Sequence, residues 1–345
     1  MKIKVIFTGG TISSEITGHG ICVSSDKSVN KLMINNFYIQ TGLLDVEFTI
    51  SQPLNTLSEN MTVSDWNVLL EELRYTDFSQ YNGIIIAHGT DTLAYTTNML
   101  SIMLAGISIP VVMVSSNYVL SDKRANGNDN FINAVFFISQ CKYSGVFAVY
   151  KNNDNENIVY LGSRLRQCEA LTNEYSSTKR IDFGKIENGR YIRNDNFSNP
   201  LEKDFSKKEL LLYKIKELTP CVLILKGYTG FDYNSIVPTH NIKAIVHYTY
   251  HGGTASSYSD NTYCTSYIDF YNKYKNRIDF YIAPLESQQE NYYSSASSII
   301  ESGVKPLFDI SEEMAYIKLL IAYSTDDSEL RRYILDNDIA FEKTI

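Results

Sequence analysis

The stretch from Gly83 to Thr92 constrains the fold of this chain more than any other part of the sequence. Residues 84–87 form an uninterrupted apolar run, which is typical of a strand buried on both faces of a parallel sheet. A polar cluster with Thr90 and Asp91 follows at once, and the apolar periodicity of residues 93–104 predicts a helix. Thr90 and Asp91 are therefore expected where a strand ends and a helix begins, which is where open α/β sheets bind ligands. The alternative is that these two residues only cap the helix.

A second turn of this kind opens the chain. Residues 2–7 are expected to form a strand, and Thr8-Gly9-Gly10-Thr11-Ile12 turns sharply out of it. Paired glycines allow a close backbone approach to a ligand and leave N–H donors uncovered by side chains. The spacing differs from the glycine patterns of dinucleotide-binding folds and phosphate-binding loops. Two threonines, Thr11 and Thr90, are thus predicted to project from one edge of one sheet.

The rest of the chain favours a two-domain α/β protein. Residues 1–193 are expected to form the first domain, the polar and charged stretch 194–218 a linker, and residues 219–345 a smaller second domain. Strand and helix patterns alternate beyond residue 219, which predicts a second parallel sheet. Residues 13–30 lack periodicity and are expected to form a long mobile loop, a common form of active-site lid.

Bulk properties narrow the class of partner. The net charge is −8 and no basic stripe occurs, so nucleic acid is not expected as a partner. No apolar run approaches the roughly 20 residues of a transmembrane helix, and a strand that begins at residue 2 leaves no room for a signal peptide. The five cysteines are unclustered, as expected of reduced thiols. We therefore expect a soluble, cytoplasmic protein.

The two turns together resemble the bacterial-type L-asparaginase family, and the chain is most similar to the cytoplasmic, type I branch. The likeness is thinner in the segment 162–170 and in the C-terminal third. The resemblance rests on Thr8–Ile12 and His88–Thr92. It extends through Ser58-Glu59-Asn60-Met61-Thr62, Asp65-Trp66 and Ala94-Tyr95-Thr96. The resemblance implies an asparaginase-like fold, with a doubly wound parallel sheet in the N-terminal domain and a smaller α/β C-terminal domain. It also implies a cofactor-independent homo-oligomer, a dimer or tetramer, whose sites are completed between subunits.

The resemblance further implies a role for each site residue. Thr11 is expected to be the nucleophile, and Thr90 to be second in that role or to lie beside the attacked carbonyl. Asp91 and Glu59 would bind the ammonium group of an amino-acid substrate, and the Ser58 hydroxyl its α-carboxylate. The implied reaction is hydrolysis of a side-chain amide, L-asparagine first, to aspartate and ammonia. Without the likeness, Ser58 and Glu59 fit almost as well as residues of a solvated loop.

Two residues that the family places beside the threonines are missing here. The family's lid tyrosine falls at Ile21 or a neighbour, and its lysine falls at Gln167 or Cys168. General-base help is worth about 10²–10⁴ in rate, so we expect slow turnover, and a lysine restored at position 167 should raise it. Arginine stays protonated and is a poor base. The candidate substitutes for the missing acceptors are His19, Lys27 and Arg166.

Histidines and the C-terminal loops carry weaker signals. His88 follows the buried strand and is expected to be a packed structural residue. His247 and His251 are four residues apart but lack the glutamate of a zinc-protease motif, so no metal site is expected. The family usually has an asparagine that reaches a neighbouring subunit's site where this chain has Gly252-Gly253-Thr254. The candidates for that role elsewhere are Glu286 and Glu290.

Two other functions remain open at this stage. A rebuilt lid would admit a modified or conjugated amide in place of asparagine. Alternatively, the chain is a binding protein that keeps the zwitterion pocket and turns over slowly or not at all. The retained Ser58, Glu59 and Asp91 favour ligand binding in every version, and only the missing tyrosine and lysine argue against catalysis.

Overall fold

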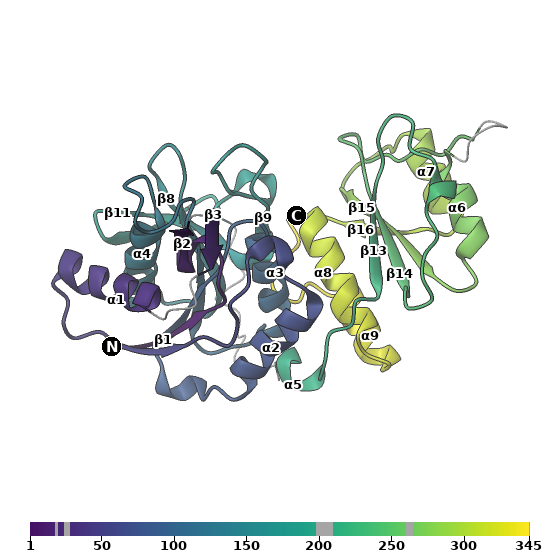
Figure 1. Cartoon of the computed structure of the whole chain (residues 1–345). Helices are drawn as coiled ribbons and strands as arrows, with labels where there is room; N and C mark the ends of the chain where they lie inside the picture. Colours follow the sequence, from purple (N-terminus) through teal and green to yellow (C-terminus); the bar gives the residue numbers. More distant parts are fainter. Residues whose placement is uncertain (18–19, 24–27, 198–209, 260–264, 345) are drawn as a thin grey trace. The chain divides into compact units, whose positions relative to one another are not determined.

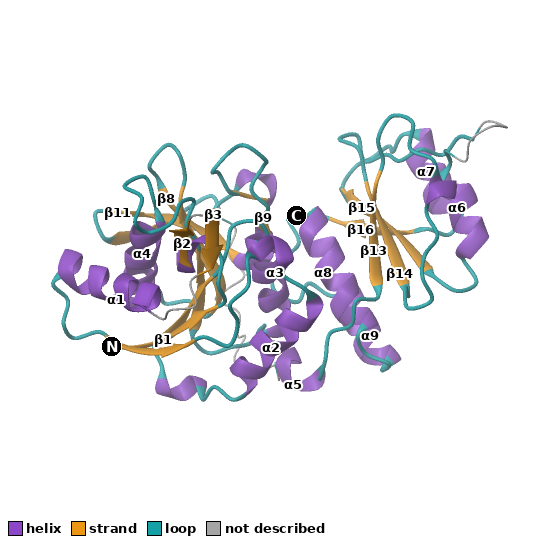
Figure 2. Ribbon diagram, viewed as in Figure 1, coloured by secondary structure: helices purple, strands orange, loops and turns teal. Residues whose placement is uncertain are grey.

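The computed structural model describes residues 1–17, 20–23, 28–197, 210–259 and 265–344, and within 15–29 only the backbone. The chain divides into two compact units, Met1–Lys216 and Glu217–Ile345, each with a sheet of its own (Figures 1 and 2). Helix α5 (Leu211–Lys214), which falls inside the predicted linker, contacts helices α2 and α3 of the first unit.

Eight of the described strands of the first unit form one mixed sheet, in the order β12-β11-β8-β7-β6-β5-β1-β4. Neighbouring strands are parallel from β4 to β7, and the pairs β7–β8, β8–β11 and β11–β12 are antiparallel. The strands are β1 (Lys2–Phe7), β4 (Glu47–Ser51), β5 (Gly83–Ala87), β6 (Pro110–Val114), β7 (Gly145–Lys151), β8 (Asn157–Leu161), β11 (Gly184–Glu187) and β12 (Arg190–Arg193). Two further ribbons pair β2 (Ser14–Thr17) with β3 (Gly20–Val23) and β9 (Leu165–Arg166) with β10 (Ser176–Ser177).

The strand order fixes where a ligand can bind. Strand β1 lies between β4 and β5, so the chain first leaves β1 in one direction across the sheet and then returns past it in the other. Such a reversal of direction opens a crevice beyond the carboxyl ends of the strands, and doubly wound sheets bind their ligands there. The two threonine-bearing turns follow β1 and β5, so both leave the sheet at this crevice. The doubly wound sheet expected for the N-terminal domain is confirmed, and it is parallel from β4 to β7.

Four helices cover the two faces of this sheet. They are α1 (Ser28–Thr41), α2 (Val63–Arg74), α3 (Leu93–Met103) and α4 (Gly127–Gln140). Helices α1 and α4 contact each other on one face, while α2 and α3 lie on the other, where both contact α5 (Figure 2). The β5–α3–β6 and β6–α4–β7 crossovers run in the same direction across the sheet but on opposite faces. The two crossovers therefore have opposite hands, so one of them is left-handed, an arrangement found in only about 2% of such connections.

The segment 13–30 differs from its prediction as a loop without regular structure. Its described backbone contains β2 and β3, paired antiparallel from Ser14 opposite Val23 to Thr17 opposite Gly20, and helix α1 already begins at Ser28. Two strands can pair through backbone hydrogen bonds alone, and such pairing imposes no alternating pattern on the sequence. The serine and glycine residues of this stretch therefore gave no sequence pattern that predicts strands.

The second unit contains the predicted second parallel sheet, in the order β13-β14-β15-β16. Its strands are β13 (Val222–Lys226), β14 (Ala244–Tyr248), β15 (Asp279–Leu285) and β16 (Lys305–Phe308). Its helices are α6 (Tyr267–Tyr274), α7 (Ser294–Glu301), α8 (Glu312–Tyr323) and α9 (Ser328–Asp336). Side chains from α6 and α7 share one buried cluster with the strands, and α8 contacts β13, β14 and β15. None of the described helices of either unit is long and apolar enough to cross a membrane.

A buried ion pair fastens the C-terminal segment of the second unit to helix α8. Lys318 Nζ lies 2.5 Å from Glu342 Oε1, and the two side chains are 1% and 0% exposed. The Glu342 carboxylate also accepts the backbone N–H groups of Ile339 and Ala340, and Lys318 donates to the Asn337 carbonyl. Both charges are thus satisfied by short local contacts. Removing one partner would leave the other charge buried and unpaired.

We predict that Lys318→Met lowers the free energy of unfolding of the second unit by about 3–5 kcal/mol, the usual cost of breaking a buried pair. Urea unfolding followed by circular dichroism measures the loss. Lys226→Met is the matched control, because Lys226 pairs with Glu312 at 3.2 Å and is largely exposed. The control should lose no more than about 1 kcal/mol. Equal losses in the two variants would contradict this account of the pair.

Candidate active site

The turn after β1 is bound by backbone hydrogen bonds to the loop after β4. The Gly10 N–H donates to the Thr56 carbonyl at 2.9 Å, and the Thr56 N–H donates to the Thr8 carbonyl at 3.0 Å. Gly9 forms an isolated parallel bridge with Thr56. These bonds continue the β1–β4 pairing past the end of both strands. They leave half-buried Thr11 at the start of a short 3-10 helix, η1 (Thr11–Ser13).

The turns after β1 and β5 touch through their backbones. A Cβ atom added to Gly10 would lie 2.3 Å from the Gly89 Cα, and one added to Gly89 would lie 2.5 Å from the Ser58 Oγ. Gly10 also has a φ of +73°, which disfavours any other residue. Both positions therefore require glycine. Because Thr11 and Thr90 are the next residues in the chain, this contact brings their turns together, in agreement with the predicted common edge.

Ser58 and Asp91 form a reciprocal hydrogen-bonded pair. The Ser58 hydroxyl donates to Asp91 Oδ2 at 3.0 Å and accepts the Asp91 N–H at 3.1 Å. The Thr92 hydroxyl adds a bond to the Ser58 carbonyl at 2.9 Å. Ser58 is buried and opens the 3-10 helix η2 (Ser58–Asn60), whereas Asp91 is exposed. The pair holds the Asp91 carboxylate beside the two turns and uses the only donor of the Ser58 hydroxyl.

His88 lies in a buried hydrogen-bonded chain that ends beside the site. The Trp66 indole donates to the Thr96 hydroxyl at 3.0 Å, which contacts His88 Nε2 at 3.0 Å. His88 Nδ1 lies 2.8 Å from the Gly89 carbonyl, which only accepts, so Nδ1 carries the proton and Nε2 accepts from Thr96. Burial lowers the pKa of His88 to about 4, so the ring is neutral at pH 7. The expected structural role for His88 agrees with this geometry.

Two side chains reach the Thr90 carbonyl from the segment after β8. Gln167 Nε2 donates to it at 2.9 Å and the Tyr175 hydroxyl at 2.6 Å. The sequence drew attention to Gln167 only as a position without the family's lysine, and it gave no sign of Tyr175. Nothing in the spacing of Tyr175 links it to a strand end or to either turn. A contact of this kind is fixed by the path of the chain between β8 and β11.

The other candidates are placed as follows. Glu59 is exposed and follows Ser58 in η2. Arg166 is exposed on β9, where it pairs with Ser176. Ile21 has its backbone in β3, and nothing is described of its side chain. His19 and Lys27 lie outside the described residues.

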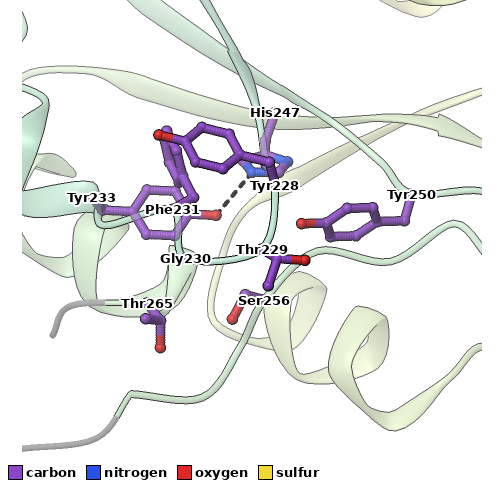
Figure 3. Close-up of a pocket in the computed structure, with 10 residues that line it drawn as sticks. Tyr228, Thr229, Gly230, Phe231, Tyr233, His247, Tyr250, Ser256 and Thr265 are labelled. Carbon is purple, nitrogen blue, oxygen red and sulfur yellow. Dashed lines mark hydrogen bonds between the residues drawn. The ribbon is translucent and has the colours of Figure 1, made fainter.

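The second unit has a cavity of about 210 Å³ at the carboxyl ends of β13 and β14 (Figure 3). Tyr228, Thr229, Tyr250 and Ser256 contribute rings and hydroxyls, and none of its described lining residues is acidic, Lys or Arg. The Tyr233 hydroxyl lies 2.8 Å from His247 Nε2 at the base (Figure 3). Burial lowers the pKa of His247 to about 4, so this lining is uncharged at neutral pH.

The other histidines and glutamates that the sequence singled out lie in the second unit. His247 is buried in β14, while His251 is exposed in the turn that contains Gly252-Gly253-Thr254. Glu286 and Glu290 are exposed in the segment after β15. Across the described parts of both units, no group of three or more His, Cys, Asp or Glu side chains is arranged to hold a metal ion.

Comparison with known proteins identifies the family. The model for "Asparaginase, N-terminal" matches residues 2–196, more than half of the chain. The chain belongs to the asparaginase family. This confirms the resemblance that the two turns indicated, and the asparaginase fold extends over both units. The thermostable L-asparaginase of Thermococcus kodakarensis superposes with a TM-score of 0.78 at 23% identity and covers 100% of both chains. L-asparaginase I of Vibrio cholerae gives 0.76 at 22% identity, covering 100% of this chain and 99% of that one.

Sequence relatives carry two different names. L-asparaginase 1 of Escherichia coli (strain K12) is 31% identical over 171 residues, which cover 49% of this chain and 48% of that protein. A glutamyl-tRNA(Gln) amidotransferase subunit of Methanococcus maripaludis is 25% identical over 355 residues, 99% of this chain and 80% of the relative. The chain is thus similar along its whole length to a protein with another name than L-asparaginase. Its asparaginase fold does not decide the substrate.

The neutral His88 predicts a stability loss in acid. Its pKa is about 4 when folded, against about 6.5 in the unfolded chain, so the unfolded chain binds more protons between these values. The contribution of neutral His88 to the free energy of unfolding is complete above pH 6.5 and is lost as the pH falls to 4. Urea unfolding measures the free energy of unfolding at pH 7 and at pH 4.5. The decrease in this free energy between the two pH values should be smaller by about 2.5 kcal/mol in His88→Gln than in wild type. Identical drops in the two proteins would contradict the buried neutral ring.

Proposed function

We propose that this protein hydrolyses the side-chain amide of L-asparagine, or of a related amino-acid amide, through an ester with Thr11. The Thr11 hydroxyl attacks the amide carbonyl carbon, the carbon–nitrogen bond breaks, and ammonia leaves with the proton that the hydroxyl gave up. Water then cleaves the ester, which releases aspartate and restores the threonine. No cofactor takes part in this scheme.

The backbone contact between Gly10 and Gly89 carries this proposal. It supports a shared site because it sets the turns of Thr11 and Thr90 against each other at the sheet crevice. The Asp91 carboxylate, held by Ser58, suits the ammonium group of the substrate, and exposed Glu59 offers a second carboxylate. Since the only donor of the Ser58 hydroxyl is engaged by Asp91, we propose that Ser58 acts on the ligand by orienting Asp91, and that it binds the α-carboxylate only when it gives up that hydrogen bond.

A second candidate function follows from the relative that is similar to this chain over its whole length. The 25% identity to a glutamyl-tRNA(Gln) amidotransferase subunit over 99% of this chain supports the same amide chemistry in one subunit of an amidotransferase. A binding protein that keeps the pocket without turnover is the third. We further propose a cytoplasmic homo-oligomer, a dimer or tetramer, in which Glu286 or Glu290 completes the site of a neighbouring subunit.

Ammonia release from asparagine tests the hydrolase directly. Without the family's lid tyrosine and lysine, we expect a turnover at least about 10² below the typical ~10 s⁻¹. Thr11→Ala should abolish release, and Thr11→Ser, which keeps a hydroxyl, should retain part of it. Hydrolysis by Thr11→Ala at the wild-type rate would remove Thr11 from the mechanism.

Ligand binding separates the three functions. Aspartate should raise the melting temperature, because a ligand that binds only the folded state stabilises it. Asp91→Ala should abolish that shift, while Asp129→Ala should keep it, since Asp129 pairs with Lys151 at 2.8 Å outside the proposed site. Binding without ammonia release, for asparagine and for glutamine alike, would select the binding protein. Release that appears only when another protein is added would select the amidotransferase.

A further inference from the structure

The carbonyl of Thr90 is held by two side-chain donors. Gln167 Nε2 approaches it at 2.9 Å and the Tyr175 hydroxyl at 2.6 Å, while the Leu93 N–H is more distant at 3.4 Å. A carbonyl oxygen has two lone pairs, so the two side chains account for its accepting capacity. Both come from the segment between β8 and β11. Thr90 is therefore held by a part of the chain outside its own turn.

Gln167 also closes the first turn of helix α3. The Ala94 N–H donates to Gln167 Oε1 at 3.3 Å. Because an N–H only donates and the Thr90 carbonyl only accepts, these two bonds determine which way the Gln167 amide points. The N-cap residue Thr92 makes no side-chain cap, since its hydroxyl bonds Ser58 instead. Gln167 thus satisfies a helix N–H group that an ordinary cap would satisfy.

Tyr175 is itself held at several points. Its backbone N–H donates to Asn152 Oδ1 at 3.1 Å, and its carbonyl accepts the Tyr160 hydroxyl at 2.9 Å. Its ring packs edge-on against Tyr150, with centroids 4.7 Å apart. The side chain is buried, and burial raises the pKa of its hydroxyl well above the usual value, so the group stays protonated. A rigid, neutral donor therefore meets the Thr90 carbonyl.

We propose that Gln167 and Tyr175 are positioning residues of the active site, which clamp the Thr90 carbonyl and thereby fix the Thr90 hydroxyl and Asp91 against the substrate. This inference rests on the proposed hydrolase function. It also changes the expectation for position 167. A lysine there would keep a donor for the Thr90 carbonyl but would leave the Ala94 N–H without its acceptor. Gln167→Lys should therefore lower turnover and not restore a base.

Removal of one oxygen atom tests the clamp. Tyr175→Phe keeps the buried ring and deletes the donor to Thr90. We expect kcat for asparagine hydrolysis to fall about tenfold, the effect of losing one buried hydrogen bond, with KM changed by less than about twofold. The loss falls on kcat because the reacting geometry is disturbed while the charged contacts to the substrate remain. A change confined to KM, with kcat left at the wild-type value, would overturn the proposal.

Tyr267→Phe provides the matched control. Tyr267 is equally buried and its hydroxyl donates to the Tyr281 carbonyl at 2.9 Å, in the second unit. This variant loses a similar hydrogen bond and a similar amount of stability, so a merely structural effect would appear in both proteins. We expect kcat and KM of Tyr267→Phe to remain within about twofold of wild type. A kcat loss shared by the two variants, or a raised kcat in Gln167→Lys, would overturn the positioning role.

Hydrogen exchange separates a failure of the clamp from a failure of the hydrolase. If wild type releases no ammonia, the proposed function fails, and the clamp is measured at the Ala94 amide. Its exchange should be at least about tenfold faster in Gln167→Met and in Tyr175→Phe than in wild type, and unchanged in Tyr267→Phe. Unchanged exchange in both site variants would overturn the clamp whatever the activity of wild type.

Discussion

Everything at the candidate site depends on two backbones that approach closer than any side chain permits. Gly10 and Gly89 occupy turns that are 79 residues apart in the chain, and a single Cβ on Gly10 would overlap the Gly89 backbone. The contact is possible because β1 and β5 are parallel neighbours that end at the same level. The hydroxyl-bearing residue after each glycine is carried along with it. The contact between the two turns thus requires both the strand order and the two glycines.

The groups around this contact are connected mainly by donors and acceptors whose direction is fixed. Ser58 and Asp91 exchange two bonds, His88 is limited to one tautomer, and Gln167 is oriented by Ala94 and Thr90. Such fully specified bonds hold a site in one geometry without needing buried charge. The tyrosine and the lysine that the family places beside the threonines are missing from this sequence. Order at the site is supplied by hydrogen bonds, and acid–base help has no assigned source among the described side chains.

The sequence was informative where the fold imposes a pattern. The all-apolar run of β5 and the glycines after β1 predicted a buried parallel sheet and its ligand edge, because burial on both faces and close backbone approach restrict the residue types. Tyr175 was not predictable, since a hydroxyl that reaches a distant carbonyl leaves no periodic trace. The β2–β3 ribbon was not predicted for a related reason, because backbone pairing by itself places little demand on residue type. The partners of Gln167 likewise depended on tertiary structure.

The hydrogen-bonded chain through His88 has a consequence for observing this protein. Trp66 is the only tryptophan in the sequence, and its indole is two hydrogen bonds from the imidazole that holds the Gly89 carbonyl. Indole emission responds to the polarity and hydrogen bonding of its surroundings, and no second tryptophan contributes to the signal. Tryptophan fluorescence, excited at wavelengths that the 26 tyrosines do not absorb, therefore reports on one interior location in the first unit, a short distance from the threonine turn. Emission from Trp66 can therefore be used to observe the surroundings of the site in the unmodified protein, without an attached dye.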